Sequence, residues 1–157
     1  MNILVVIPAR GGSKGIPRKN LRLLGHKPLL YYSINNALKS KFEIDVFVSS
    51  EDDEILHTAK KFGAKVHKRN KNIANDKTTL DPVIYDCYLH AKNIEEKEYH
   101  IIATMQPTSP LLLTKSLDGA LEKIINDNGI DTIIAAKDVT HLSWKKENDK
   151  YLPNYTE

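Results

Sequence analysis

Short apolar runs recur along the chain, and stretches whose apolar positions repeat with helical spacing lie between them. The runs predict strands at residues 2–8, 44–48, 64–67, 100–105 and 132–136. The stretches between them predict helices over about 28–40, 51–62, 80–93 and 114–127. Regular alternation of strands and helices predicts a three-layer α/β fold, with a mostly parallel sheet and helices on both faces.

Local signals support two of the helices. In the first, Leu30, Ile34 and Leu38 recur every four residues and form an apolar stripe. In the second, Ser50 is the expected N-cap, and Asp53 stands three residues later, as in a capping box.

The expected domain organisation has two parts. Residues 1–137 contain all five predicted strands and form a nucleotide-binding core. Residues 138–157 read as a polar tail without an apolar stripe, and we interpret them as the start of a second half that is missing or truncated. We expect this tail to be mobile.

Several classes of protein are disfavoured by composition. The single cysteine, Cys87, allows no disulfide framework, and its place on the apolar face of a predicted helix indicates an inert thiol. The apolar start is too short for a signal peptide and lacks a basic segment before it. No apolar run approaches the roughly 20 residues that span a bilayer. A cytoplasmic protein is the expectation.

The segment 7–20 begins at the end of the first apolar strand and is rich in glycine and basic residues. Its glycines let the backbone approach a ligand closely, and its cations offer charge to an anion. This combination predicts a nucleotide-triphosphate site. The alternative is an ordinary turn with solvated lysines. The cations are Arg10, Lys14, Arg18 and Lys19.

The spacing of these glycines matches neither a P-loop nor a dinucleotide-binding fingerprint. The charge distribution still favours an anionic ligand. Residues 1–42 hold eight Lys/Arg and no Asp or Glu, whereas the other 115 residues hold 15 basic and 20 acidic side chains. Nucleic acid is the rival partner, but the cations lie in a glycine loop, and no nucleic-acid-binding motif is present.

A second candidate segment, Gln106 to Pro110, follows the predicted strand at 100–105. Its two prolines stiffen the backbone, so an amide and two hydroxyls are presented by a rigid loop. Such a loop suits recognition of a base edge or a sugar hydroxyl. The alternative is a structural turn before the next helix.

A third candidate comprises Arg69 and the polar run 75–79. Thr78 or Thr79 either caps the following helix or contacts a ligand, and the two roles are compatible. Together the three candidates follow strands whose carboxyl ends share one edge of a parallel sheet, where α/β proteins bind ligands.

Carboxylates that could hold magnesium are difficult to assign. Glu51 to Glu54 follow the second strand, but acids that begin a helix are explained by its dipole. Asp76 is possible, and no Asp-x-Asp follows a strand. The six histidines show no metal-ligand spacing.

Residues 7–20 (IPARGGSKGIPRKN), the loop from Arg69 to Thr79 and the segment Gln106–Pro110 (QPTSP) resemble the N-acylneuraminate cytidylyltransferases, or CMP-sialic acid synthetases. The resemblance covers nearly the whole chain. It implies the Rossmann-like fold of nucleotide-diphospho-sugar transferases. It also implies that CTP is coupled to a nine-carbon 2-keto sugar acid, giving a CMP-sugar and pyrophosphate.

The resemblance implies catalytic roles for Arg10 and Lys19, which would stabilise charge on the leaving pyrophosphate with help from magnesium. The sugar's anomeric hydroxyl would attack the α-phosphorus. The implied partners are CTP and a sugar acid, with neither nucleic acid nor membrane, and a homodimer for a full-length form. The implied nucleotide-binding residues are Ala9, Arg10, Gly11, Gly12, Ser13, Asn20, Arg69, Thr78, Thr79 and Gln106.

Two departures from the family pattern affect this expectation. Leu112 stands where relatives commonly have an arginine, and the acids expected to hold magnesium lie beyond Glu157. Two alternatives therefore stay open. One is a nucleotidyltransferase for another sugar acid, such as deoxy-octulosonate, pseudaminate or legionaminate. The other is a nucleotide-binding fragment or remnant without turnover.

Overall fold

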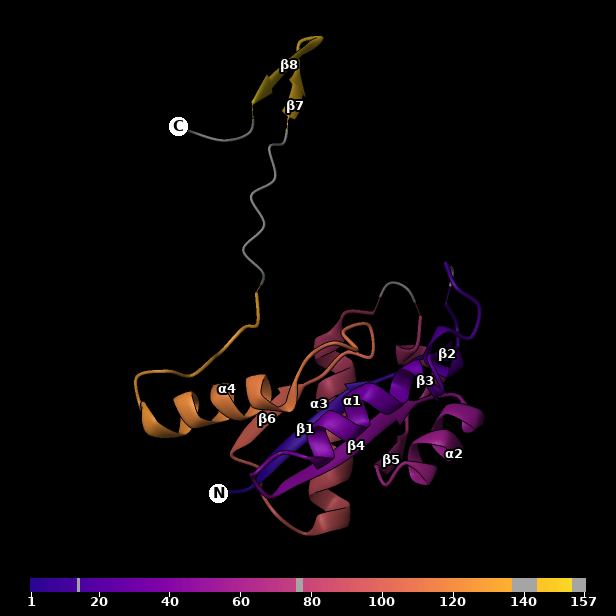
Figure 1. Ribbon diagram of the computed structural model, residues 1–157, viewed down its shortest axis with the longest axis vertical. Coiled ribbons are helices and arrows are strands. Elements are labelled where there is room, and N and C mark those ends of the chain that lie inside the picture. The colour runs from indigo at the N-terminus through magenta and orange to yellow at the C-terminus, as the bar shows by residue number, and fades with distance from the viewer. Residues whose placement is uncertain (14, 76–77, 137–143, 154–157) are drawn as a thin grey trace.

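The computed structural model describes residues 1–13, 15–75, 78–136 and 144–153. The described part of the chain has a four-stranded parallel sheet in the order β5-β4-β1-β6 (Figure 1). The strands are β1 (Ile3–Pro8), β4 (Ile44–Ser50), β5 (Lys65–Lys68) and β6 (Ile101–Thr104). The helices are α1 (Leu29–Leu38), α2 (Asp53–Lys61), α3 (Leu80–Glu95) and α4 (Thr114–Asn126).

Strand β1 is buried on both faces, which explains its unbroken apolar sequence. Val5 and Ile7 point to one side, where they join a core cluster with residues of α1, α2 and α4. Leu4 and Val6 point to the other side, where they pack with Cys87 and Ala91 of α3. The predicted three-layer α/β fold is therefore confirmed.

The chain changes direction across the sheet at β1. From β1 it proceeds through α1 to β4 and through α2 to β5, on one side of β1. Helix α3 then carries it back across the other face to β6, which pairs with the opposite edge of β1. The carboxyl ends of β1 and β6 thus form a topological switch point, the usual ligand position in open α/β sheets.

Short elements that the sequence pattern did not predict lie between the main ones. After β1 come the 3₁₀-helix η1 (Lys19–Leu21) and a small hairpin of β2 (Leu23–Leu24) and β3 (Lys27–Pro28). Gly25 has a φ of 63° in the turn of this hairpin, a conformation that glycine adopts at low cost. After β5 comes η2 (Lys71–Ile73).

The expected N-cap of the second helix was wrong. Strand β4 continues through Ser50, whose carbonyl accepts a hydrogen bond from the Arg69 amide. Asp52 is the N-cap of α2 instead, and its side chain accepts from the amides of Glu54 and Ile55. Asp53 is the first residue of the helix, so it completes no capping box with Ser50.

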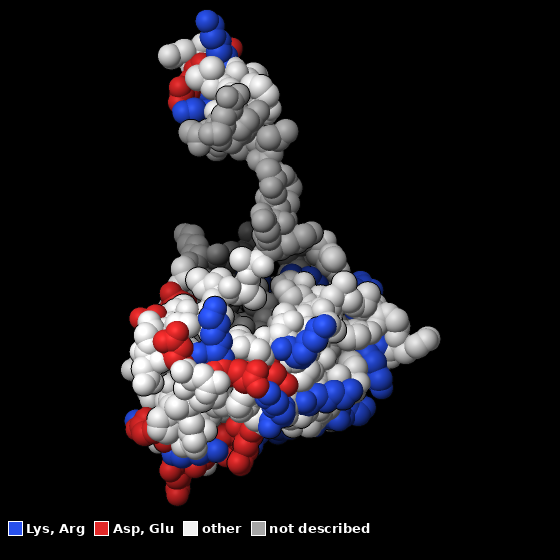
Figure 2. Space-filling view, turned by 60° about the vertical axis from the view of Figure 1, so that its left-hand side comes forward, with Lys and Arg blue, Asp and Glu red and all other residues white. Residues whose placement is uncertain are grey.

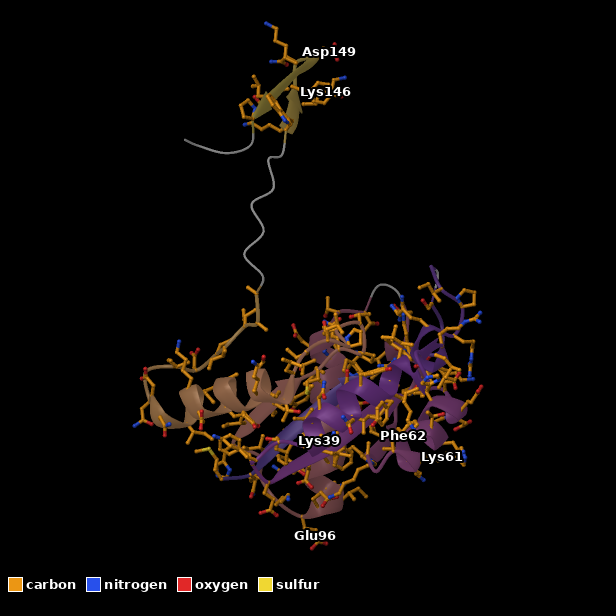
Figure 3. The ribbon with its side chains drawn as sticks, viewed as in Figure 1. Lys39, Lys61, Phe62, Glu96, Lys146 and Asp149 are labelled. Atoms are coloured by element: carbon orange, nitrogen blue, oxygen red, sulfur yellow. The ribbon has the colours of Figure 1, made fainter. Side chains whose placement is uncertain are left out.

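Figure 3 labels residues at the C-terminal ends of α1, α2 and α3. Lys39 and Phe62 are the C-caps of α1 and α2, and Glu96 ends α3 with a left-handed φ of 51°. Leu38, which the four-residue spacing placed in the core, is 46% exposed because it lies in the last turn of α1. Ala37 is buried there instead.

The predicted strand at 132–136 was also wrong. These residues have no regular structure and are exposed, with Ile134 at 81%. Figure 1 shows this segment leaving the end of α4 and running away from the sheet. β-Branched residues favour a strand where they can pair and pack, and among the described residues 132–136 have no partner strand.

The polar tail contains an unexpected hairpin. Strands β7 (Trp144–Glu147) and β8 (Lys150–Pro153) pair antiparallel, with all of their residues exposed. Asn148 and Asp149 both have positive φ, at 48° and 60°, as a two-residue type I′ turn requires. Lys146 and Asp149 form an ion pair of 2.9 Å across the turn (Figure 3). The expected domain boundary near residue 137 lies outside the described residues.

Among the described residues, no helix is long and apolar enough to cross a membrane.

Cys87 provides a direct test of the core. Burial, with the nearby charge of Asp86, raises the pKa of its thiol to about 12. Because the thiolate is the reactive form, the folded protein should not react with Ellman's reagent at pH 8. It should react fully once denaturant is added. Labelling of the folded protein at the rate of a free thiol would contradict this account of α3.

Candidate functional site

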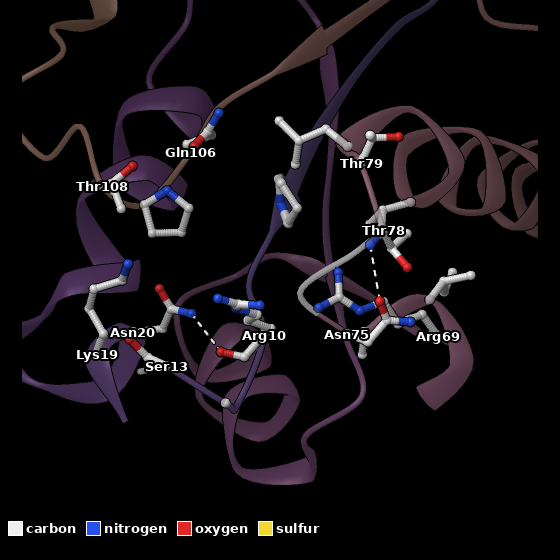
Figure 4. A pocket seen from close by; sticks show the side chains of 17 residues that line it. Arg10, Ser13, Lys19, Asn20, Arg69, Asn75, Thr78, Thr79, Gln106 and Thr108 are labelled. Atoms are coloured by element: carbon white, nitrogen blue, oxygen red, sulfur yellow. Dashed lines mark hydrogen bonds between the residues drawn. The ribbon is translucent and has the colours of Figure 1, made fainter. Parts of the chain in front are cut away.

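A pocket of about 210 Å³ opens at the carboxyl edge of the sheet. Three segments line it: residues that follow β1, residues that follow β5 with the start of α3, and residues that follow β6. Figure 4 shows polar side chains from all three segments converging on it. The lining includes these residues singled out from the sequence: Arg10, Gly12, Ser13, Lys19, Asn20, Arg69, Thr78, Thr79 and Gln106.

Ala9 and Gly11 do not line the pocket. Ala9 is fully buried, and its amide donates to the carbonyl of Ser49 at 3.0 Å. The Gly11 amide donates to Oε1 of Glu51 at 2.7 Å. A side chain at Gly11 would meet Asp52, because a Cβ there would lie 2.5 Å from Oδ2. Both residues therefore position the loop, and the glycine permits close approach to α2.

The phosphate-loop side of the pocket is built around Asn20. This buried side chain donates from Nδ2 to the carbonyl of Arg10 at 2.9 Å, which fixes the backbone beside the arginine (Figure 4). Helix η1 begins at Lys19, so the lysine is presented next to Asn20. Arg10, Ser13 and Lys19 thus place a guanidinium, a hydroxyl and an ammonium group around one side of the pocket.

Arg69 enters from the β5 side as a buried residue. Its Nη2 and Nε donate to Oε2 of Glu51 at 2.8 and 3.2 Å. Glu51 was considered from the sequence only as a helix-dipole acid or a metal ligand. Its pairing with a residue 18 positions away could not be read from local pattern.

The loop before α3 is organised by its asparagine side chains. The Thr78 amide donates to Oδ1 of Asn75 at 3.0 Å (Figure 4). Nδ2 of Asn75 donates in turn to the carbonyl of Asn72 at 2.6 Å. Thr79 occupies the N-cap position of α3 but makes no side-chain capping bond. Asp76 lies outside the described residues.

The Gln106 segment is tied to the sheet and to α1. The Met105 amide donates to the Val6 carbonyl at 3.0 Å, and the Ser33 hydroxyl donates to the Gln106 carbonyl at 3.4 Å. The Gln106 side chain is exposed at the pocket. Thr108 also lines the pocket and lies within the segment that the prolines marked as rigid.

Arg18 has a different role from Arg10 and Lys19. It does not line the pocket and instead pairs with Asp52 and Glu54 at the start of α2. Burial opposes ionisation of Asp52, but the hydrogen bonds from Arg18 and from the helix amides outweigh it and lower the pKa of this carboxyl. On the face shown in Figure 2, acidic side chains lie directly beside basic ones. This face is not the uniformly basic surface that a phosphate backbone would favour.

The described part of the chain contains no set of side chains placed to bind magnesium. The described residues contain no group of three or more His, Cys, Asp or Glu that could hold a metal ion. Among the described residues, no carboxylate lines the pocket. Glu51 and Asp52, the acids next to it, already bind Arg69 and Arg18.

Comparison with known proteins places this pocket in context. Residues 4–150 match the family profile described as cytidylyltransferase. The chain belongs to the cytidylyltransferase family.

Two curated relatives illustrate the similarity. A pseudaminic acid cytidylyltransferase of Campylobacter jejuni is 40% identical over 128 residues, which cover 81% of this chain and 55% of the relative. The N-acylneuraminate cytidylyltransferase A of Danio rerio is 34% identical over 145 residues, covering 92% of this chain and 32% of the relative. This cytidylyltransferase chain therefore spans about half or less of the length of these relatives.

Solved structures agree with the fold. A cytidylyltransferase from Leptospira borgpetersenii superposes with a TM-score of 0.66 at 27% identity, covering 82% of this chain and 51% of that one. A CMP:2-keto-3-deoxy-manno-octonic acid synthetase complexed with CTP gives a TM-score of 0.67 at 21% identity. That alignment covers 83% of this chain and 50% of the other, and it supports the fold alone.

This family member also contains a polar chain that runs from the buried Ser49 and His67 to the partly exposed Asp86. The Ser49 hydroxyl lies 3.1 Å from Nδ1 of His67, and Nε2 of His67 lies 3.3 Å from Oδ2 of Asp86. The order is that of a hydrolase triad, but Ser49 is fully buried and cannot reach a substrate. Burial lowers the pKa of His67, while the charge of Asp86 opposes the shift and His90 adds to it.

The lowered pKa of His67 predicts how stability depends on pH. An unperturbed histidine has a pKa of about 6.5, so below that pH the unfolded chain binds a proton more readily than the folded protein does. The free energy of unfolding should therefore fall as the pH drops from 7 to 5. Asp52, whose pKa is also lowered, affects stability only near pH 4 and below.

Denaturant unfolding of the wild type and of His67→Asn across this range measures the effect. The variant should lose most of the slope, because an amide does not titrate. His57→Asn, which changes an exposed histidine on α2, should retain it. Equal slopes in the wild type and His67→Asn would contradict the assignment.

Proposed function

We propose that the protein transfers a cytidylyl group from CTP to a nine-carbon or related 2-keto sugar acid, giving a CMP-sugar and pyrophosphate. One observation carries the proposal: Arg10 and Lys19 line a single pocket together with Arg69 and Gln106, although these residues come from three separate loops. Membership of the cytidylyltransferase family supports the same reaction class.

In this proposal the triphosphate lies on the side of the pocket formed by Gly12, Ser13, Arg10 and Lys19. Backbone amides and two cations are suited to phosphate oxygens, and a guanidinium can bind two of them at once. Cytosine and ribose would lie toward the other two segments, where Gln106 offers both an amide donor and an acceptor.

The reaction would proceed by attack of the sugar's anomeric hydroxyl on the α-phosphorus. A new oxygen–phosphorus bond forms while the hydroxyl loses its proton to solvent. The bond between the α-phosphorus and the β-phosphate oxygen breaks, so that pyrophosphate leaves with the electron pair. Arg10 and Lys19 would stabilise the charge that develops on the leaving group. Positioning and charge stabilisation are the main requirements of such chemistry. Magnesium as a cofactor rests on the family resemblance, and the described residues support no step through it.

The sugar acid is proposed only as a class. Similar proteins include a pseudaminic acid cytidylyltransferase and a CMP-N,N'-diacetyllegionaminic acid synthase of Campylobacter jejuni, as well as N-acylneuraminate cytidylyltransferases. A second candidate function is nucleotide binding without turnover by this 157-residue polypeptide. The absence of carboxylates from the described pocket lining favours it, because metal stabilisation at the reacting phosphate contributes several kcal/mol. Pyrophosphate release with CTP, magnesium and each sugar acid separates the two candidates.

Calorimetric titration with CTP tests the nucleotide site that both candidates share. Arg10→Ala should weaken CTP binding by about 1.5–3 kcal/mol, the usual contribution of a charge-assisted hydrogen bond. The fold should survive, because Arg10 lines an open pocket at the end of β1 and is not part of the apolar core.

Lys39→Ala is a suitable control, since it removes an exposed cation at the C-cap of α1, outside the pocket lining. Its CTP affinity should equal that of the wild type. ATP should bind the wild type more weakly than CTP. If Arg10→Ala destabilises the fold but its folded fraction binds CTP with unchanged affinity, the arginine has a structural role and the proposed contact with the nucleotide is wrong. If ATP binds the wild type as tightly as CTP does, the proposed preference for cytosine is wrong.

A further inference from the structure

We propose that Glu51 is a positioning residue of the nucleotide site, which holds the loop after β1 and the Arg69 guanidinium in fixed positions relative to one another. The inference rests on the proposed function, in which this pocket binds a nucleotide. It assigns to Glu51 a role different from the helix-dipole or metal-ligand roles that its sequence context indicates.

The contacts of Glu51 reach both neighbouring segments. It is the first residue after β4, the strand that lies between β1 and β5 in the sheet. One carboxylate oxygen, Oε1, accepts the Gly11 amide at 2.7 Å. The other, Oε2, accepts Nη2 and Nε of Arg69 at 2.8 and 3.2 Å. A single side chain thus joins the segments that follow three adjacent strands.

Burial makes these contacts costly to lose. The side chain of Arg69 is only 4% exposed and that of Glu51 only 15% exposed. A guanidinium removed from water needs a charged partner with good geometry, and Oε2 of Glu51 supplies it by accepting two of the Arg69 N–H groups. Arg69 lines the pocket, and Gly11 lies between the lining residues Arg10 and Gly12. Fixing Arg69 and Gly11 therefore fixes two of the three segments that line the pocket.

The chemistry of the contacts requires a carboxylate at position 51. Both partners of Glu51 are donors, and an ionised carboxylate is acceptor-only. A glutamine at this position has one acceptor oxygen and one donor nitrogen, so it can satisfy either Gly11 or Arg69 but not both. An aspartate keeps the charge but is one methylene shorter, so its reach to the two partners is reduced.

The neighbouring acids make different contacts, which provides a matched control. Asp52 caps α2 and pairs with Arg18. The side chain of Asp53 is 89% exposed and pairs with Lys68. Asp53→Asn therefore makes the same change of charge at the start of the same helix without touching Gly11 or Arg69.

Calorimetric titration with CTP measures the effect of each variant. Glu51→Gln should weaken CTP binding by about tenfold, the effect of one charge-assisted hydrogen bond, and Asp53→Asn should change it by less than about twofold. Glu51→Asp, which keeps the charge, should fall between the wild type and Glu51→Gln. It also serves as the second variant if Glu51→Gln does not fold.

A double-mutant cycle with Arg69→Ala distinguishes positioning from a general loss of stability. If Glu51 acts through Arg69, Glu51→Gln should cost about threefold or less in CTP affinity when Arg69 is already alanine, because the Gly11 contact alone remains. The same loss in both backgrounds would overturn the proposal. So would an equal loss in Asp53→Asn.

A second measurement needs no nucleotide. In ¹⁵N-resolved spectra of the protein alone, Glu51→Gln should shift the Gly11 amide and the Arg69 Nε–H resonances, and Asp53→Asn should leave both in place. Unchanged resonances in Glu51→Gln would overturn the positioning role. If the wild type binds no CTP, the proposed function fails, while these spectra still decide whether Glu51 holds the two groups.

Discussion

The structure depends on burying β1 on both faces and pairing it along both edges. An apolar strand of this kind is stable only between two neighbours and two helical layers. The chain meets that constraint by extending to one side through β4 and β5 and then returning to the other side as β6. This reversal of direction creates the space for a ligand, because the loops after β1 and β6 diverge at the carboxyl ends of these two strands. The pocket occupies this edge of the sheet.

Charge pairing then shapes the loops around the pocket. Residues 1–42 carry no acidic side chain, so the basic loop after β1 finds its acidic partners at the start of α2. Glu51 accepts the Gly11 amide, and Asp52 accepts from Arg18, so this loop is held at two points. Arg10 and Lys19 line the pocket, which leaves them placed to meet an anionic ligand. Their presence in a cytidylyltransferase family member is consistent with phosphate recognition by this loop.

The sequence predicted the features that depend on short-range pattern. The apolar run of Ile3–Ile7 and the helical spacing of Val83, Cys87 and Ala91 follow directly from which faces are buried, and the structure places them as expected. The polar segments after β1, β5 and β6 meet at the pocket because parallel strands share one carboxyl edge. The predicted roles of individual pocket residues in catalysis stay predictions.

Other features depend on contacts that local pattern does not encode. The pairing of Glu51 with Arg69 and Gly11 joins residues that are distant in sequence. The apolar run 132–136 has strand propensity, but propensity without a partner strand does not make a strand. The sequence analysis missed the β7–β8 hairpin because its strands have no buried face and therefore no apolar pattern. Its main sequence signal is the pair of turn residues, Asn148 and Asp149.

Amide hydrogen exchange with and without CTP tests most directly the claim that three loops form one nucleotide site. CTP should slow exchange together in residues 10–13, 69–75 and 106–109, since one ligand would contact all three segments. The β7–β8 hairpin, which contributes nothing to the pocket lining, should be unaffected. Protection of only one of the three segments, or of the hairpin instead, would contradict the account.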